Sequence, residues 1–219
     1  MRRPPPLQLV FVTLPVFLGA CSTTMLRLPT TASNAIIPAA QVERALAIAD
    51  EYLRYGRIDD ELRWAPYLCR QPMPGVARQS ASTDQGTHGH KLYSVFAKDH
   101  AGYPSASEVG QVIVKQSWKA ELLEEGAMKP GPLERAGLER EDHFYPYATK
   151  DGRTFRATEP AGLFLMYRVE RGSPDSDEGW IYATVSTDRR VTASGRIESC
   201  MGCHEAAPHG RLFGVPRAP

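Results

Sequence analysis

Two apolar segments in the last third of the chain constrain its fold most strongly. Leu163 to Val169 (LFLMYRV) and Trp180 to Val185 (WIYATV) are rich in aromatic and β-branched residues, which favour strands. The residues between them, ERGSPDSDEG, are dominated by turn formers. A pair of strands with such a link is typical of an antiparallel hairpin. This part of the chain is therefore predicted to form an antiparallel sheet.

Two further segments carry the same signal, and a helix precedes them. His90 to Ala97 (HKLYSVFA) and Gly110 to Trp118 (GQVIVKQSW) are predicted strands. Residues 64–89 and 129–160 are rich in Pro and Gly without a clear period, and we expect long connections there. The expected N-terminal helix ends near Gly56, and its apolar residues recur at helical spacing: Val42, Ala45, Leu46, Ala49 and Leu53. The predicted fold class is α+β, a mainly antiparallel β-sheet with an N-terminal amphipathic helix and a short C-terminal helix.

The N-terminus has the pattern of an export signal. Arg2 and Arg3 precede a short apolar run, which ends in Leu18-Gly19-Ala20-Cys21. A cysteine at this place resembles the lipidation site of bacterial lipoproteins. We predict a lipoprotein-type signal peptide over residues 1–20, a flexible tether over 21–40 that starts at lipidated Cys21, and a single domain over 41–219. An ordinary signal peptide with an incidental cysteine is the alternative.

Export implies a location on the periplasmic side of a bacterial membrane, with the outer membrane favoured. No apolar stretch after the leader is long enough to span a bilayer, so we expect membrane attachment only through the lipid. The chain has 26 basic and 25 acidic residues, and it therefore lacks the positive excess that attracts nucleic acid.

The run SCMGCHEAAPHG, residues 199–210, carries the clearest chemistry. On a helical turn, Cys200 and Cys203 lie on one face, close enough to reach the two vinyl groups of one haem. His204 follows directly and is placed to ligate the iron. The motif predicts one covalently attached haem c, held by Cys200, Cys203 and His204. Covalent haem of this kind is attached outside the cytoplasm, and the predicted export signal would bring the protein there.

Two other interpretations of the motif fit less well. A zinc site would draw on Cys200, Cys203, His204 or His209, but these residues lack the separation that lets two ligand pairs close a tetrahedron. A redox dithiol normally follows a strand in a βαβ unit, and none is predicted here. The remaining cysteine of the domain, Cys69, is expected to be a small buried apolar residue.

One lysine stands inside a predicted strand. In GQVIVKQSW, alternation places Lys115 on one face with Ile113 and Ser117, and Val112 with Val114 on the other. A solvated face is the ordinary explanation for such a lysine. The alternative is a pocket that lowers its pKa and makes the amine a nucleophile.

Four segments in this order, GHKLYSVFAKD, VGQVIVKQSW, GWIYATVSTD and SCMGCHEAAPHGRLFG, resemble the cytochrome P-460 family over residues 88–214. The resemblance implies a mainly antiparallel, usually dimeric fold with one five-coordinate haem c on His204. In the enzymatic members a lysine is joined to the haem ring, and Lys115 matches its position. These members oxidise hydroxylamine with nitric oxide to nitrous oxide. The related cytochromes c′-beta lack the cross-link and bind small gases behind aromatic caps, for which Phe96 is the candidate here.

Together these observations predict an exported mono-haem cytochrome with an open distal site. It would oxidise hydroxylamine or a related small nitrogen species, with a lysine–haem cross-link, and would exchange electrons with an unidentified redox partner. The alternatives are a non-catalytic protein that binds nitric oxide or carbon monoxide, and an electron-transfer cytochrome. No pattern in the sequence singles out a sixth ligand or a distal base.

Overall fold

The architecture comes from a computed structural model, which describes residues 36–58, 62–64, 70–72, 75–76, 78–80, 89–104, 108–124 and 144–214. The predicted signal peptide, Cys21, Cys69 and residues 129–143 lie outside the described residues. One compact unit begins at Ile36 and contains every described element.

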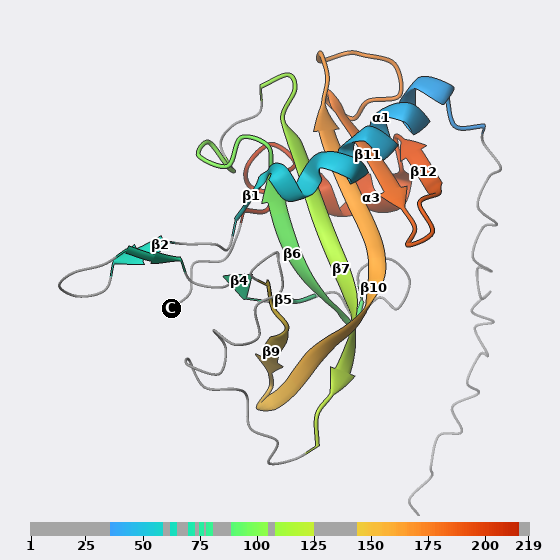
Figure 1. The fold of residues 1–219 in the computed structure, drawn as a ribbon. Helices are drawn as coiled ribbons and strands as arrows, with labels where there is room; N and C mark the ends of the chain where they lie inside the picture. The colour runs from blue at the N-terminus through green and yellow to red at the C-terminus, as the bar shows by residue number, and fades with distance from the viewer. Residues whose placement is uncertain are drawn as a thin grey trace, which may run out of the picture. The chain divides into compact units, whose positions relative to one another are not determined.

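An antiparallel sheet in the order β1-β6-β7-β10-β11-β12 forms the frame, with β5 added beside β6 and β9 beside β10 (Figure 1). Its strands are β1 (Gly56–Arg57), β5 (Arg78–Gln79), β6 (Lys91–Ala97), β7 (Val112–Leu122), β9 (Tyr147–Lys150), β10 (Arg153–Arg168), β11 (Trp180–Val185) and β12 (Val191–Gly195). Two small pairs complete the described strands: antiparallel β2 (Leu62–Trp64) with β3 (Arg70–Pro72), and parallel β4 (Gly75–Val76) with β8 (Phe144–Tyr145). The prediction of a mainly antiparallel sheet is confirmed.

One face of the sheet is covered by α1 (Ala39–Glu51), which continues as a short 3₁₀ turn, Tyr52–Arg54 (Figure 1). The helix begins inside the segment predicted as a tether. The core on this face contains Ala45, Ile48, Tyr52, Phe96, Val112, Val114, Leu165, Tyr167, Ile181, Ala183 and Val185. Leu53 was expected among the buried residues of the helix, but it is 57% exposed because the 3₁₀ turn changes the helical phase and buries Tyr52 instead.

The opposite face is covered by α3 (Glu198–His204), which follows β12 (Figure 1). Its core contains Ala97, Ile113, Met166, Trp180, Tyr182, Cys200 and Leu212. Alternate residues of β7 divide between the two cores, as the period-2 pattern predicts: Val112 and Val114 face α1, and Ile113 faces α3. The helix that carries the Cys-x-x-Cys-His motif is thus packed directly on the sheet.

The long strand β10 corrects the expectation that residues 129–160 are only connections. Within the described part, β9 and the first half of β10 pair as a hairpin from Tyr147 onward. Two register shifts against β7, between Ala157 and Pro160 and between Pro160 and Gly162, bend the strand. Gly162 has φ +95°, and a Cβ there would lie 2.8 Å from the Val185 carbonyl oxygen, so only glycine fits.

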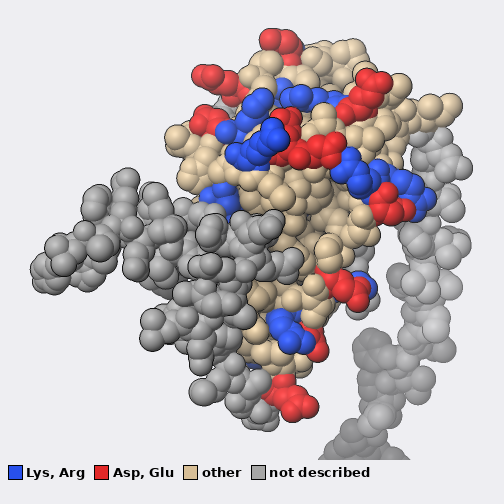
Figure 2. Space-filling view, viewed as in Figure 1, with Lys and Arg blue, Asp and Glu red and all other residues tan. Residues whose placement is uncertain are grey.

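Charges of both signs alternate on the face around α1 (Figure 2). The Arg189–Asp50 ion pair, for example, joins the turn after β11 to the helix. This mixture gives no single-sign patch on the visible face. None of the helices in the described ranges has the length and apolar character needed to cross a membrane.

Candidate functional site

The helix α3 presents the two cysteines differently. Cys200 and Cys203 are one turn apart, and both are free thiols. Cys200 is 8% exposed and packs in the core beneath the helix, whereas Cys203 is exposed. A group attached through both sulfurs would therefore have one attachment point at the core and the other at the surface.

The ring of His204 is held by a hydrogen bond to a main-chain carbonyl seven residues later. Its Nδ1 lies 2.6 Å from the Arg211 carbonyl oxygen, and because a carbonyl can only accept, Nδ1 carries the proton. In the neutral ring this leaves the lone pair on Nε2. Burial lowers the pKa of His204, the hydrogen bond to Arg211 opposes this, and the charge of Lys115 lowers the pKa further. The ring is thus fixed in the tautomer that suits a metal ligand.

The carbonyl that holds His204 belongs to a tight turn. His209 and Leu212 exchange main-chain hydrogen bonds of 3.1 and 3.3 Å across Gly210 and Arg211, which have φ of +58° and +78°. Positive φ at both central positions favours glycine or asparagine, so the arginine is unusual here. The indole Nε1 of Trp180 donates to the Gly210 carbonyl at 3.0 Å and fastens the turn to the sheet.

A buried carboxylate lies behind this turn. Asp177 is 3% exposed and accepts hydrogen bonds from Arg211 Nη2 at 2.9 Å and from the Tyr182 hydroxyl at 2.8 Å. Burial raises the pKa of Asp177, but the hydrogen bonds from Arg211 and Tyr182 outweigh it, and the net pKa is lowered. Burial, together with the bond to Asp177, raises the pKa of Tyr182. The Tyr182 ring in turn lies 5.4 Å from the His204 ring, centroid to centroid.

Lys115 lies on the same face of the sheet as α3. It pairs with Val95 and Phe164 on the neighbouring strands, and Val95 packs against the core that contains Cys200. The Lys115 Nζ is 4.1 Å from the centre of the Tyr93 ring. Burial, followed by the nearby charge of Lys91, lowers the pKa of Lys115 to about 8. A fully solvated face therefore does not describe its surroundings.

The structure does not bring Phe96 to this site. Phe96 is 3% exposed beneath α1, where its ring meets Tyr52 edge-on at 5.1 Å. Because successive residues of a strand point to opposite faces, Phe96 points away from the face that carries Lys115. The prediction that it caps the site is corrected on this ground. Tyr93 and Phe164 are the aromatic residues beside Lys115, and strand alternation from Lys115 across the sheet could have indicated them.

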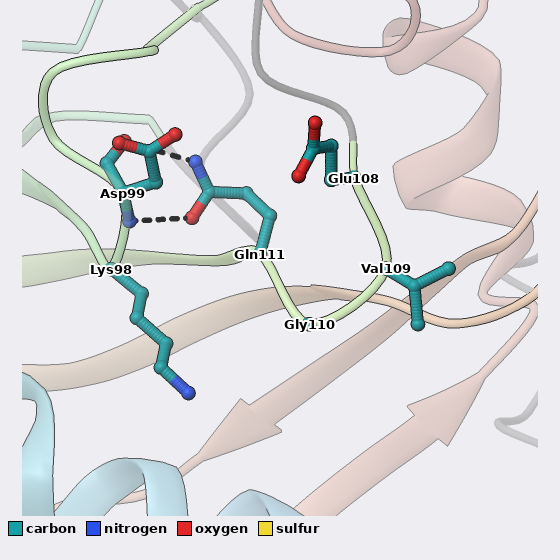
Figure 3. Close-up of a pocket in the computed structure, with 6 residues that line it drawn as sticks. All are labelled: Lys98, Asp99, Glu108, Val109, Gly110 and Gln111. Carbon is teal, nitrogen blue, oxygen red and sulfur yellow. Dashed lines mark hydrogen bonds between the residues drawn. The ribbon is translucent and has the colours of Figure 1, made fainter.

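Four described carboxylates that could act as a base by residue type lie away from the motif helix: Asp99, Glu108, Glu121 and Glu159. Glu121 pairs with Arg156, and Glu159 pairs with Lys119, in exposed ion pairs toward the far end of β7. Asp99 and Glu108 line a surface pocket at the opposite end of this strand (Figure 3). The other residues that line this pocket are Lys98, Val109, Gly110 and Gln111.

Two hydrogen bonds hold the lining of this pocket together. The Gln111 amide oxygen accepts from the Asp99 main-chain N–H at 2.9 Å, and the Gln111 amide nitrogen donates to the Asp99 carbonyl at 3.0 Å. None of the residues of the Cys-x-x-Cys-His motif lines it. The pocket is therefore not part of the candidate site.

The geometry bears on the two alternatives for the motif. In the described part of the chain, no three His, Cys, Asp or Glu side chains are grouped so that they could hold a metal ion, which gives the zinc interpretation no support. A reactive dithiol needs a cysteine of lowered pKa, whereas burial raises the pKa of Cys200. The helix α3 follows β12, which pairs with β11 in the antiparallel direction, whereas the strands of a βαβ unit are parallel.

Comparison with known proteins leaves the sequence resemblance as a prediction. No protein-family model matches the chain, and no curated protein matches it significantly.

The residues present fit a covalent haem c by their donor chemistry. Two free thiols one helical turn apart could each add across a vinyl double bond to form a thioether, a reaction that needs no external oxidant or reductant. The neighbouring histidine keeps Nε2 available because Nδ1 is bound to a carbonyl. The sheet face beside them carries aromatic rings and two half-buried lysines, Lys91 and Lys115.

Proposed function

We propose that the protein is an exported mono-haem c-type cytochrome with an open distal site, which oxidises hydroxylamine or a related small nitrogen species. Cys200 and Cys203 would hold the haem, and His204 would ligate its iron. Lys115, by the family resemblance, would be joined to the ring. When bound, the haem would supply the redox-active iron and an open position for a small ligand.

One observation carries the proposal: the motif helix and Lys115 share one face of the sheet. Cys200 packs into the core on that face, and Val95, the partner of Lys115, packs against the same core. The lysine is near enough for its charge to lower the pKa of His204. A sheet that put Lys115 on the α1 face would have left the two functional predictions unrelated.

The chain's own residues support three parts of this function. Nδ1 of His204 is tied to the Arg211 carbonyl, which orients the ring and makes Nε2 a better donor. Tyr93 and Phe164 place aromatic rings beside Lys115, and the charge of Lys91 lies near the same rings. The lowered pKa of Lys115, about 8, increases the fraction of neutral amine available for bond formation.

The same proposal includes the location and assembly expected from the sequence. A signal peptide would direct export, and lipid on Cys21 would anchor the protein on the periplasmic side of a bacterial membrane, with the outer membrane favoured. The resemblance further implies a homodimer and an unidentified redox partner.

A non-catalytic binder of nitric oxide or carbon monoxide is the second candidate. The positions of three described carboxylates favour this candidate, because none of them lies at the site. Glu121 and Glu159 form exposed ion pairs, and Asp99 lies in a separate pocket. Proton-coupled oxidation needs a base near the ligand, whereas gas binding does not.

The first experiment asks what the haem is attached to. Tryptic digestion of the purified protein is expected to release a haem peptide that contains residues 200–204 joined to the strand of Lys115. Lys115→Met should release the haem with the 200–204 peptide alone. Lys119→Met, four residues along the same strand and exposed, should leave the joined peptide unchanged. Haem joined to Cys200 and Cys203 only in the wild type would contradict the cross-link and favour the gas-binding candidate.

The second experiment asks whether the distal position is open. The visible spectrum of the ferrous protein is expected to change on addition of carbon monoxide, because an open sixth position takes the gas. A low-spin ferrous protein that ignores the gas would instead indicate an electron-transfer cytochrome. Turnover of hydroxylamine with an electron acceptor would then separate catalysis from simple binding.

A further inference from the structure

We propose that the Asp177–Arg211 ion pair is a positioning device for His204, which fixes the carbonyl that accepts from its Nδ1 and thereby sets how strongly Nε2 donates to iron. Arg211 is a positioning residue, because it acts through its carbonyl and not on a substrate. The inference rests on the proposed haem function and extends it to the proximal side of the site.

The first step is the backbone of Arg211. Its φ of +78° lies in the left-handed region, which is unfavourable for a residue that has a Cβ. The turn from His209 to Leu212 therefore gains nothing from arginine as a backbone residue. What arginine adds is a side chain long enough to reach Asp177, whose Oδ1 it meets at 2.9 Å.

The second step is the anchor itself. Asp177 is held by mutual main-chain hydrogen bonds with Trp180, at 2.7 and 2.8 Å, at the start of β11. Its second oxygen accepts from the Tyr182 hydroxyl at 2.8 Å. The carboxylate is 4% exposed and the guanidinium side chain 20% exposed, so water screens this pair less than the surface pairs. The sheet thus holds Arg211 at one end of its side chain, and the Gly210 carbonyl is held by Trp180.

The third step leads to the histidine. With the side chain anchored, the Arg211 carbonyl stands 2.6 Å from His204 Nδ1. A short, fixed hydrogen bond at this nitrogen shifts electron density toward Nε2 and restricts the rotation of the ring. The Tyr182 ring, 5.4 Å from the His204 ring, contacts both the anchor and the ligand. One buried carboxylate therefore controls both the acceptor and a neighbour of the histidine.

The test compares two arginines that both have a positive φ, Arg211 and Arg189. Arg211→Asn removes the link to Asp177 while asparagine still accepts a positive φ. Arg189→Asn is the matched control, because Arg189 also has a positive φ, +63°, and also pairs with an aspartate, Asp50, but on α1. The readout is the iron–histidine stretching band in the resonance Raman spectrum of the ferrous protein, after the mass of each preparation has established that haem is attached.

Arg211→Asn is expected to move this band to lower frequency, and Arg189→Asn to leave it at the wild-type position. Loss of such a supporting partner typically lowers metal affinity or activity by about 10- to 100-fold, so we also expect the iron–histidine band to disappear from part of the Arg211→Asn molecules. Arg211→Lys, which keeps the charge and most of the reach, should return the band toward the wild type.

Other outcomes overturn the inference in distinguishable ways. Wild-type protein without attached haem would refute the proposed function and this inference with it. Haem-loaded Arg211→Asn with an unmoved band would refute the positioning role alone. Should Arg211→Asn not fold, Arg211→Gln decides: it shortens the side chain and removes the charge that pairs with Asp177, and an unmoved band in this haem-loaded variant refutes the role equally.

Discussion

The two faces of the central sheet are closed by different means. On the α1 face, side chains such as Ile48, Val112 and Leu165 meet in a mainly aliphatic core. On the α3 face, the core of Trp180 and Tyr182 continues into a hydrogen-bonded chain of ionisable groups that ends at His204. One sheet thus separates a face that supplies stability by packing from a face that orients chemical groups.

This difference has a physical reason. Apolar packing tolerates small shifts, because dispersion and the hydrophobic effect have little directionality. Hydrogen bonds require a direction and a distance, so each donor and acceptor on the α3 face fixes the next. A face built this way can hold a ligand ring in one orientation, but it is costly when one partner is lost.

The largest expected effect is the removal of the buried carboxylate. Asp177→Ala should lower the free energy of unfolding by about 4 kcal/mol, because it leaves the Arg211 charge and the Tyr182 hydroxyl without their partner. Urea denaturation checks this value. Asp188→Ala, which loses an exposed pair with Arg190, should move the midpoint little. Equal losses in the two variants would contradict the distinction between the faces.

The α1 face should respond to loss of volume. Ile48→Ala should cost about 3 kcal/mol of unfolding free energy, because Ile48 is fully buried and its removal leaves a cavity. Leu53→Ala lies in the 3₁₀ turn that follows the helix, at a side chain that is 57% exposed, and should change the unfolding free energy by less than about 0.5 kcal/mol. A large effect at Leu53 would indicate that the 3₁₀ turn is packed differently.

A smaller effect concerns pH and Lys115. Its pKa in the folded chain is about 8, against an ordinary value of 10.5, because burial and then Lys91 disfavour the charge. Between these pH values the unfolded chain binds more protons than the folded chain, so unfolding free energy should rise as pH increases from about 8 to 10.5. The measurement compares urea denaturation across this range in the wild type and in Lys115→Met.

The rise should be absent from Lys115→Met and retained in Lys119→Met. It should also be absent from wild-type molecules whose Lys115 amine is joined to haem, since that nitrogen no longer titrates as an ordinary lysine. A wild type that lacks both the rise and the joined haem peptide would contradict the buried environment of Lys115.

The smallest effect is expected at the far end of the sheet. Glu159→Gln breaks the 2.7 Å contact with Lys119, but both side chains are largely exposed, at 71% and 65%. Water and salt screen such a pair, so the thermal midpoint should stay within experimental error of the wild type. A clear loss of stability would show that this end of the sheet is held more tightly than its exposure indicates.

Local patterns predicted much of the fold. Alternation in Gly110 to Trp118 placed Lys115 correctly opposite Val112 and Val114. The first half of β10 was missed because Pro160 and Gly162, which make the bulges, resemble loop residues in the sequence. Phe96 was chosen for its residue type, although the same alternation would have assigned it to the α1 face.

The hydrogen-bonded chain from Asp177 through Arg211 to His204 could not be predicted, because it depends on contacts between segments that are distant in the sequence. Asp177 lies in a link that reads only as a turn, and its partner Arg211 is 34 residues later. The positive φ of Arg211 has no signal in the sequence, since arginine is not a residue typical of that conformation. Only the meeting of the two segments on the sheet gives either residue a role.

The acceptor for His204 is a main-chain carbonyl, and this has a consequence for how the protein can change over generations. Every amino acid supplies such a carbonyl, so no single substitution at position 211 can delete the acceptor. Substitutions there, at Asp177 or at Tyr182 can only displace it by degrees. The orientation of the His204 ring is therefore open to gradual adjustment by mutation, at a cost in stability that is largest at Asp177.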